Sequence, residues 1–162
     1  MSLSAQSIKW YNPQDADFHV VQGQSFACEE RQSFYNRLPL SAKGVVRKAV
    51  WSLSKQSAGE SICFSTDSKN VTVRYKVNLA LAKNHMPATG VSGVDLYTHD
   101  RHGNEEWLAP KYSFKDTVTY VYSDIGRTKL NKTNPHYTLY LPLYNEVEWL
   151  EIGVDDGAEF CF

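Results

Sequence analysis

The segment that decides the fold reads His85-Met86-Pro87-Ala88-Thr89-Gly90-Val91-Ser92-Gly93-Val94-Asp95-Leu96-Tyr97. Its first part predicts a loop, because Pro87 blocks regular strand pairing and disfavours a helical conformation of the residue before it. Gly90 and Gly93 permit backbone angles or close approaches that other residues do not. The segment therefore begins as an irregular stretch in which two glycines allow tight packing.

The end of this segment predicts a strand. Val94 and Leu96 fall on one face, and Gly93, Asp95 and Tyr97 fall on the other, because successive side chains of a strand point to opposite faces. An acidic residue inside a strand is unusual, and a buried Asp95 would need a cation or several N–H donors. A polar constellation is therefore expected where a sheet edge meets a loop, which suits a binding site and equally a braced structural corner.

The rest of the chain repeats short alternating segments between turn residues. Residues 71–77 are the clearest, since valine and tyrosine alternate there with threonine, arginine and lysine, as in a strand with one wet face. The other expected strands cover residues 18–21, 45–53, 61–65, 105–109, 117–122, 137–141 and 147–152. Residues 8–13 predict a packed arm, 78–84 fit a short helix or a strand end, and 124–135 predict a polar loop. This pattern predicts an all-β fold, an antiparallel β-sandwich or jelly roll.

Composition excludes several classes of protein. The 162 residues fit one domain with a sizeable core, and 42 % hydrophobic residues indicate a globular chain. The formal net charge of -1 and the lack of a run of basic residues argue against a nucleic-acid or anionic-membrane partner, because phosphate binding needs clustered positive charge. No stretch of the sequence approaches the length of a membrane span.

The cysteines and the N-terminus give information on disulfide bonds, metal binding and export. Cys28, Cys63 and Cys161 allow at most one disulfide, which leaves one thiol free. No Cys/His cluster has the spacing of a zinc site, and no metal or cofactor is expected. Residues 1–7 are too short and polar for a signal peptide; they are interpreted as an added methionine joined to the start of a mature exported chain. Residues 8–162 are then expected to form a single domain.

Ser61 is the candidate for a nucleophile, because it lies in the turn-like sequence Gly59-Glu60-Ser61-Ile62. A serine nucleophile needs a general base, an orienting acid and an oxyanion hole. Nucleophile turns usually open a helix, whereas Ser61 precedes an expected strand, and no Asp-x-x-His pair supplies the base and the acid. The sequence therefore favours a turn without a catalytic role, and no catalytic residue is predicted.

Two polar residues of the central segment have both structural and functional interpretations. A lone loop histidine such as His85 is more often a hydrogen-bonding strut than a catalyst. Asp95 either accepts hydrogen bonds from backbone N–H groups of residues 90–92, pairs with an arginine such as Arg74, or binds a sugar hydroxyl; the structural roles are favoured. Exposed aromatic rings would stack on sugars, although core packing is the default for them; the rings concerned are Trp107, Tyr112, Tyr120, Tyr122, Tyr137, Tyr140 and Tyr144.

The sequence Gly93-Val94-Asp95-Leu96-Tyr97 resembles the Gly-x-Asp-Leu-Tyr (GxDLY) signature of the domain that precedes the catalytic domain in SGNH-hydrolase-type esterases. The agreement extends through residues 85–92, and further similar stretches are Arg37-Leu38-Pro39, Val50-Trp51-Ser52-Leu53, Ser57-Ala58-Gly59 and Tyr140-Leu141-Pro142-Leu143-Tyr144. The resemblance covers most of the chain. It implies a β-sandwich that precedes a flavodoxin-like hydrolase in bacterial, usually exported proteins, often linked to the cleavage of carbohydrate esters.

The family's catalytic blocks are a glycine-serine nucleophile turn, a Gly-x-Asn block and an Asp-x-x-His pair, all in the hydrolase domain, and none matches a position here. The resemblance therefore implies a non-catalytic accessory domain that packs on the C-terminal hydrolase domain of the same polypeptide and shapes the approach of acylated carbohydrate. The residues expected at the domain interface or substrate approach are His85, Met86, Pro87, Thr89, Gly90, Ser92, Gly93, Asp95 and Tyr97. Two alternatives are a carbohydrate-binding module with its own sugar affinity and a structural domain whose apolar face the hydrolase covers.

Overall fold

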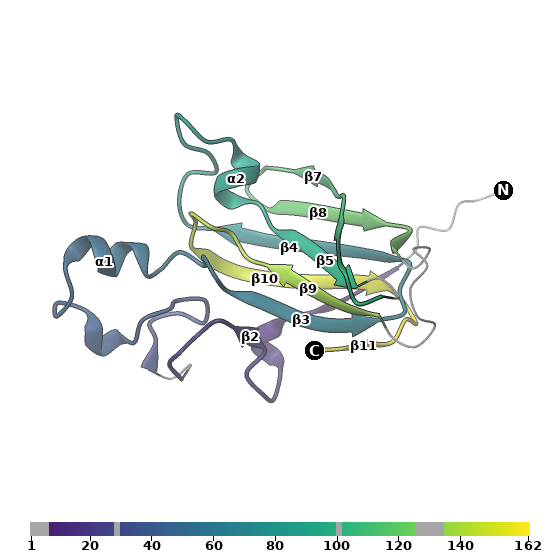
Figure 1. Ribbon diagram of the computed structural model, residues 1–162, viewed down its shortest axis with the longest axis horizontal. Helices are drawn as coiled ribbons and strands as arrows, with labels where there is room; N and C mark the ends of the chain where they lie inside the picture. Colours follow the sequence, from purple (N-terminus) through teal and green to yellow (C-terminus); the bar gives the residue numbers. More distant parts are fainter. Residues whose placement is uncertain (1–6, 28–29, 100–101, 126–134) are drawn as a thin grey trace.

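The computed structural model describes residues 7–27, 30–99, 102–125 and 135–162, in which two antiparallel sheets pack against each other (Figure 1). The first sheet has the strand order β1 (Ile8–Tyr11), β10 (Val147–Asp155), β4 (Asn70–Val77), β8 (Val118–Ser123) and β7 (Lys111–Ser113). The second has the order β11 (Phe160–Cys161), β3 (Ser61–Thr66), β9 (His136–Tyr140), β5 (Asp95–His99) and β6 (Glu105–Leu108), with β2 (Val21–Gln22) paired to β3. The prediction of an all-β antiparallel sandwich is confirmed, and the narrower jelly-roll assignment stays a prediction.

The core lies between the sheets and is built by strand alternation. In β4, Val71, Val73 and Tyr75 are fully buried, while the residues between them are half-buried. The facing sheet contributes Ile62, Phe64, Leu96, Tyr137 and Leu139, all of which are buried as well. Burial of one such side chain stabilises a fold by roughly 1.5–3 kcal/mol, so the two inner faces hold the sheets together.

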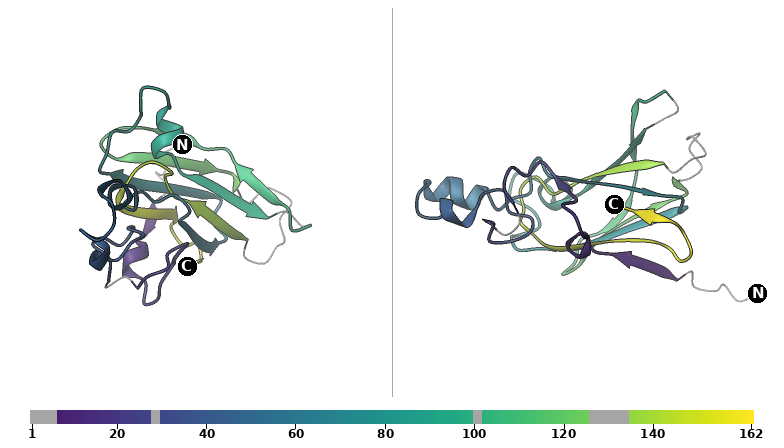
Figure 2. Two further views of the ribbon diagram at one scale, coloured as in Figure 1. Left: turned by 60° about the vertical axis from the view of Figure 1, so that its left-hand side comes forward. Right: turned by 90° about the horizontal axis from the view of Figure 1, so that it is seen from below.

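The helices are short, namely α1 (Lys48–Leu53), α2 (Ala88–Ser92) and the 3₁₀ turns η1 (Pro13–Asp15) and η3 (Leu40–Ala42). The strand predicted over residues 45–53 is wrong, because this stretch ends in α1. Trp51 N–H donates to the carbonyl of Arg47 at 3.0 Å, and Ser54 N–H donates to that of Val50 at 2.9 Å. Figures 1 and 2 show that α1 projects from one end of the sandwich, where it has no neighbouring strand to pair with.

Other segments also differ from the sequence prediction. Residues 8–13, expected as an arm, contribute β1, an edge strand that places Trp10 opposite Gly153 of β10. The strand expected over 18–21 shrinks to the two residues of β2. Residues 78–84 form neither a helix nor a strand, and the segment 88–92, expected as a loop, forms α2. Most of the loop predicted over 124–135 lies outside the described residues.

Two of the three cysteines lie in the described part of the chain. Cys63 on β3 and Cys161 on β11 both carry free thiols, while Cys28 lies outside the described residues. No helix in the described ranges combines the length and the apolar character that crossing a membrane would require.

Candidate functional site

The signature segment makes a tight joint between α2 and β5. The backbone N–H of Gly93 donates to the carbonyl of Thr89 at 3.2 Å and closes α2. A Cβ atom at position 93 would overlap that same carbonyl and would lie 2.7 Å from the hydroxyl oxygen of Tyr120. Glycine is therefore required by space and not by its φ of -73°, which any residue adopts. Burial, together with the negative charge of Asp95, raises the pKa of Tyr120, so its hydroxyl stays protonated against this joint.

The predicted site residue Ser92 belongs to a buried hydrogen-bond network. Its hydroxyl donates to the carbonyl of Leu81 at 2.9 Å and accepts from Asn145 Nδ2 at 2.8 Å. Asn145, which is fully buried, also accepts from the backbone N–H of Leu79 at 2.9 Å. The Tyr75 hydroxyl donates to the Ser92 carbonyl at 2.6 Å. Ser92 thus fixes the loop 78–87 to the sandwich, and its side chain is not available to a ligand.

An open hollow of about 360 Å³ lies where α2 and β5 meet β6 and the end of β9. It is lined by Thr89, Gly90, Gly93, Asp95, Tyr97, Glu105, Tyr140, Leu141 and Leu143. The structure therefore brings together five of the residues that the sequence placed in the candidate site.

The other four predicted residues do not line this hollow: Ser92, described above, and His85, Met86 and Pro87. His85 is exposed at the tip of a turn in which Lys83 and Met86 exchange backbone hydrogen bonds of 3.0 and 3.1 Å. Pro87 precedes the first residue of α2 with φ of -67°, a value preset by its ring. These residues shape the turn that leads into the site.

Asp95 is one of the two carboxylates that line the hollow, together with Glu105. The residue is exposed, and its Oδ1 atom accepts a hydrogen bond of 3.0 Å from the indole Nε1–H of Trp107. This bond joins β5 to β6 diagonally, because Trp107 lies opposite Tyr97 in the strand register. The Trp107 ring is 50 % exposed, so Asp95 fixes an aromatic surface that faces solvent.

Within the described residues, neither of the two structural partners predicted for Asp95 is found. Its hydrogen bond comes from Trp107 and not from the backbone of residues 90–92. Arg74 lies on the other sheet, where its Nε donates to Glu151 at 2.6 Å. The Arg74 guanidinium also stacks on the Trp10 ring, 3.8 Å from its centroid. An exposed carboxylate held by an indole remains available to a ligand.

Two tyrosines form the floor of the hollow next to Asp95. Tyr97 and Tyr140 pack edge to face, with centroids 5.6 Å apart and planes at 88°. Tyr140 is directly opposite Asp95 in the β5–β9 pairing and is 40 % exposed. The hollow therefore combines ring surfaces, which bind apolar faces of ligands, with carboxylates, which accept hydrogen bonds from hydroxyl or N–H groups.

The site prediction missed the residues that come from other strands. Glu105 lies on β6, and Leu141 and Leu143 follow β9. Their approach to Asp95 depends on the pairing of β5 with both β6 and β9. The sequence 140–144, noted for its resemblance, was the one available signal for the leucines.

Ser61 is not arranged for nucleophilic catalysis. Gly59 has a φ of +85°, and Glu60 N–H donates to the carbonyl of Ser57 at 2.9 Å, which confirms a tight turn before β3. Ser61 itself is buried and lies opposite Tyr140, and no imidazole bonds to it within the described ranges. Across the same residues, no three His, Cys, Asp or Glu side chains are grouped to hold a metal ion.

Glu60 is a fully buried acid that the sequence analysis did not single out. Its Oε1 atom accepts a hydrogen bond of 2.8 Å from Gln24 Nε2. Burial raises the pKa of Glu60 to about 7, although the Gln24 hydrogen bond and the positive charges of Arg31 and Arg37 oppose this rise. The group lies outside the hollow and belongs to the internal structure of the fold.

Two comparisons with known proteins give a match, one with a family model and one with a solved structure. The family model described as GxDLY, the N-terminus of SGNH-hydrolase-type esterases, matches residues 8–160. A crystal structure named as a "putative GDSL-like lipase" from Bacteroides ovatus ATCC 8483 is similar, with a TM-score of 0.72 and 23 % sequence identity. The alignment covers 95 % of this chain and 42 % of that protein. Comparison with curated proteins gives no match.

The family match and the geometry concern the same residues. The signature residues Gly93, Asp95 and Tyr97 are the ones that α2 and its neighbours collect into the hollow, and the family match spans nearly the whole described sandwich. The structural likeness to the lipase agrees with this at the level of the fold. The chain belongs to the GxDLY family, the N-terminal domain of SGNH-hydrolase-type esterases.

Proposed function

We propose that the chain is the non-catalytic accessory domain of an exported SGNH-type esterase that acts on acylated carbohydrate. In this proposal the domain packs on the hydrolase domain of the same polypeptide, and the hollow beside Asp95 shapes the approach of substrate. Family membership supports the partner. The observation that carries the role in substrate approach is the hollow itself, which Asp95 lines while its carboxylate accepts a hydrogen bond from the neighbouring, exposed Trp107.

The chemistry of the hollow fits a neutral polyol with apolar C–H faces. Trp107 and Tyr140 offer solvent-exposed ring surfaces on which a sugar ring can stack. The Asp95 Oδ2 atom and the Glu105 carboxylate can accept hydrogen bonds from hydroxyl groups. An open hollow of this kind would guide a chain of sugars toward a neighbouring active site without enclosing it.

The test compares two substrates in the full polypeptide that includes the hydrolase domain. We expect Asp95→Ala to lower kcat/KM for acetylated xylan by about tenfold, as for the loss of roughly 1–2 kcal/mol of binding. Hydrolysis of p-nitrophenyl acetate should stay unchanged, because a small ester does not need the hollow. Asp116→Ala, which removes an exposed carboxylate on the turn between β7 and β8, is the matched control. Equal rates of Asp95→Ala and wild type on both substrates would reject the proposal.

A second function is favoured by the exposure of the rings. Because Trp107 is 50 % and Tyr140 40 % exposed, the hollow could bind sugar with an affinity of its own, as a carbohydrate-binding module does. Calorimetry of this chain with xylo- and manno-oligosaccharides separates the two functions. Binding heat that Trp107→Ala abolishes would identify a carbohydrate-binding module, whereas the accessory role predicts no measurable heat for the isolated chain.

A further inference from the structure

A second feature of the surface lies apart from the hollow, in the segment of residues 40–55, which we call the basic arm. The arm contains η3 and α1 and projects from the end of the sandwich (Figures 1 and 2). It is bonded at its base, where Arg37 N–H donates to the carbonyl of Ser54 at 3.0 Å and Arg37 Nη2 donates to that of Leu53 at 2.7 Å. The base of the arm is therefore held by hydrogen bonds, whereas most residues of the arm itself are exposed to solvent.

Four apolar side chains of the basic arm are exposed to solvent. Val45 is 82 % exposed, Leu53 53 %, Leu40 50 % and Val50 36 %. Val50 and Leu53 are three residues apart and therefore share one face of α1. A helix of six residues is not stable in water by propensity alone, so these exposed side chains indicate a surface that packs against something else.

The arm is also positively charged. Lys43, Arg47, Lys48 and Lys55 lie within it, and the sequence has no Asp or Glu between Glu30 and Glu60. No ion pair joins these four cations to a carboxylate of the described residues. The chain as a whole has a net charge of -1, so the positive charge is local to this end of the molecule.

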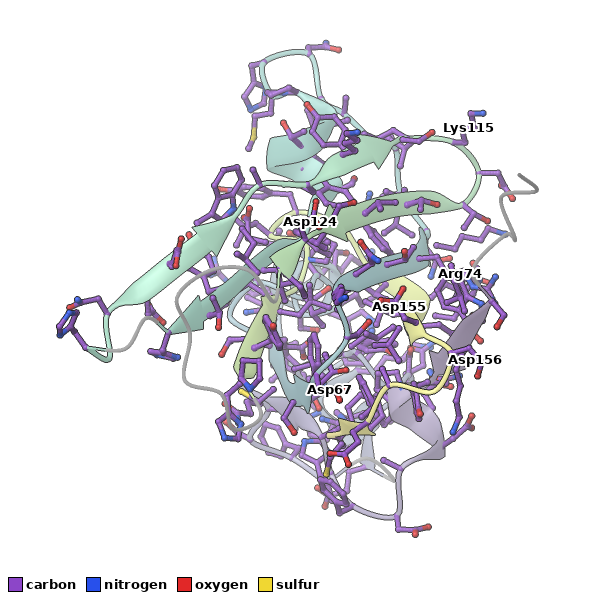
Figure 3. All side chains as sticks on the ribbon, turned by 90° about the vertical axis from the view of Figure 1, so that its right-hand side faces the viewer. Asp67, Arg74, Lys115, Asp124, Asp155 and Asp156 are labelled. Carbon is purple, nitrogen blue, oxygen red and sulfur yellow. The ribbon has the colours of Figure 1, made fainter. Side chains whose placement is uncertain are left out.

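Four aspartates lie at the opposite end of the sandwich, namely Asp67, Asp124, Asp155 and Asp156 (Figure 3). Asp155 accepts hydrogen bonds of 3.2 Å from the backbone N–H groups of Lys69 and Asn70, and Asp67 accepts one of 2.8 Å from that of Glu159. These two carboxylates are used within the fold, whereas the cations of the basic arm have no such role in the described structure.

We propose that the basic arm docks on an acidic and apolar face of the hydrolase domain of the same polypeptide. This inference rests on the proposed function and names the contact surface that it requires. The similar Bacteroides protein extends well beyond the aligned part, which is 42 % of its length, so such proteins contain a large further region for the arm to contact. The four cations, which have no ion-pair partner among the described residues, favour an acidic surface, and the exposed side chains of Val45, Val50 and Leu53 favour an apolar one.

A chain of hydrogen bonds connects the end of the arm to the hollow. Immediately after the arm, the N–H and the hydroxyl of Ser57 both donate to the carbonyl of Asn145, each at 3.2 Å. Asn145 in turn holds Ser92, which precedes the Gly93 joint. A hydrolase domain held by the arm would therefore be positioned relative to the hollow through buried hydrogen bonds.

The test measures amide hydrogen exchange of α1 in the full polypeptide and in the 162-residue chain. We expect the amides of Trp51 and Ser54 to exchange at least about tenfold more slowly in the full polypeptide, because docking buries the helix. The variant Val50→Asp/Leu53→Asp should abolish this protection, and Lys48→Glu should reduce it. The matched controls, which should retain it, are Phe18→Asp, at a side chain 59 % exposed, and Lys69→Glu, at an exposed position on the turn between β3 and β4 at the opposite end of the sandwich.

Several results would overturn this inference. Equal exchange of α1 in both polypeptides would show that the arm does not dock. Protection that rises with protein concentration would identify a second copy as the partner, and Leu53-dependent co-sedimentation of the 162-residue chain with phosphatidylglycerol vesicles would identify a lipid surface. An active esterase that depends on Asp95 but leaves α1 unprotected refutes the docking alone. A protected α1 in a protein without esterase activity refutes the proposed function alone.

Discussion

The replacement Glu60→Gln tests the account of the buried acid at the start of β3. Glu60 is fully buried, and burial raises its pKa from the ordinary value of 4.5 to about 7, against the opposing effects of Gln24, Arg31 and Arg37. Below about pH 4.5 the carboxyl is protonated in both the folded and the unfolded state. As the pH rises from 4.5 to 7, the unfolded state loses its proton while the folded state keeps it, so the free energy of unfolding falls.

Above pH 7 both states are ionised and the loss is complete. Because one pH unit of separation between the two pKa values corresponds to about 1.4 kcal/mol, the full loss is about 3 kcal/mol. A glutamine cannot ionise, and its amide oxygen can accept the same hydrogen bond from Gln24. We therefore expect Glu60→Gln to stabilise the fold by about 3 kcal/mol at pH 8 and to change its stability little at pH 4.

Urea unfolding followed by tryptophan fluorescence at pH 4, 6 and 8 measures this difference. Glu159→Gln, at an exposed position, is the control and should show no such pH dependence. A Glu60→Gln variant that is less stable than wild type at pH 8 would refute the reasoning. That result would mean that the ionised carboxylate is stabilised by Arg31 and Arg37 more than burial destabilises it.

Two further substitutions test the joint beside the hollow. Gly93→Ala places a methyl group against the Thr89 carbonyl and 2.7 Å from the Tyr120 hydroxyl, and should destabilise the fold by about 1–3 kcal/mol in urea unfolding, as overpacking does; an unchanged midpoint would contradict the steric argument. Asn145→Ala leaves the part-buried backbone N–H and carbonyl of Leu79 without their Asn145 partner and should lower the free energy of unfolding by about 1–3 kcal/mol, with faster amide exchange of residues 78–87. Exchange in that loop at the wild-type rate would show that other contacts hold it.

Much of the fold could be predicted from alternation because most strands have one buried and one wetter face. Residues 71–77 and 93–97 show this pattern in the sequence, and the buried side chains there are the apolar ones at Val71, Val73, Tyr75, Val94 and Leu96. Residues 45–53 misled the prediction, because their valines suggested a strand. Val45 and Val50 are exposed instead, so these hydrophobic residues belong to the surface of the protein and not to its core.

The site could be predicted in part for a related reason. Five residues of the site are neighbours in the sequence, and local steric constraints keep them together at the start of β5. They are Thr89, Gly90, Gly93, Asp95 and Tyr97. The contributions of Glu105 and Leu143 depend on which strands pair with β5, and the sequence alone does not specify that register. The bond between Trp107 and Asp95 depends on the same register.

Ester hydrolysis by the 162-residue chain itself tests the central claim most directly, since that claim assigns these strands to a non-catalytic domain. The measurement is the release of p-nitrophenol from p-nitrophenyl acetate by the wild-type chain and by Ser61→Ala. The account predicts that both chains release it at the same rate as buffer. Turnover by the wild-type chain that Ser61→Ala abolishes would contradict the account, because it would place a working nucleophile inside the sandwich.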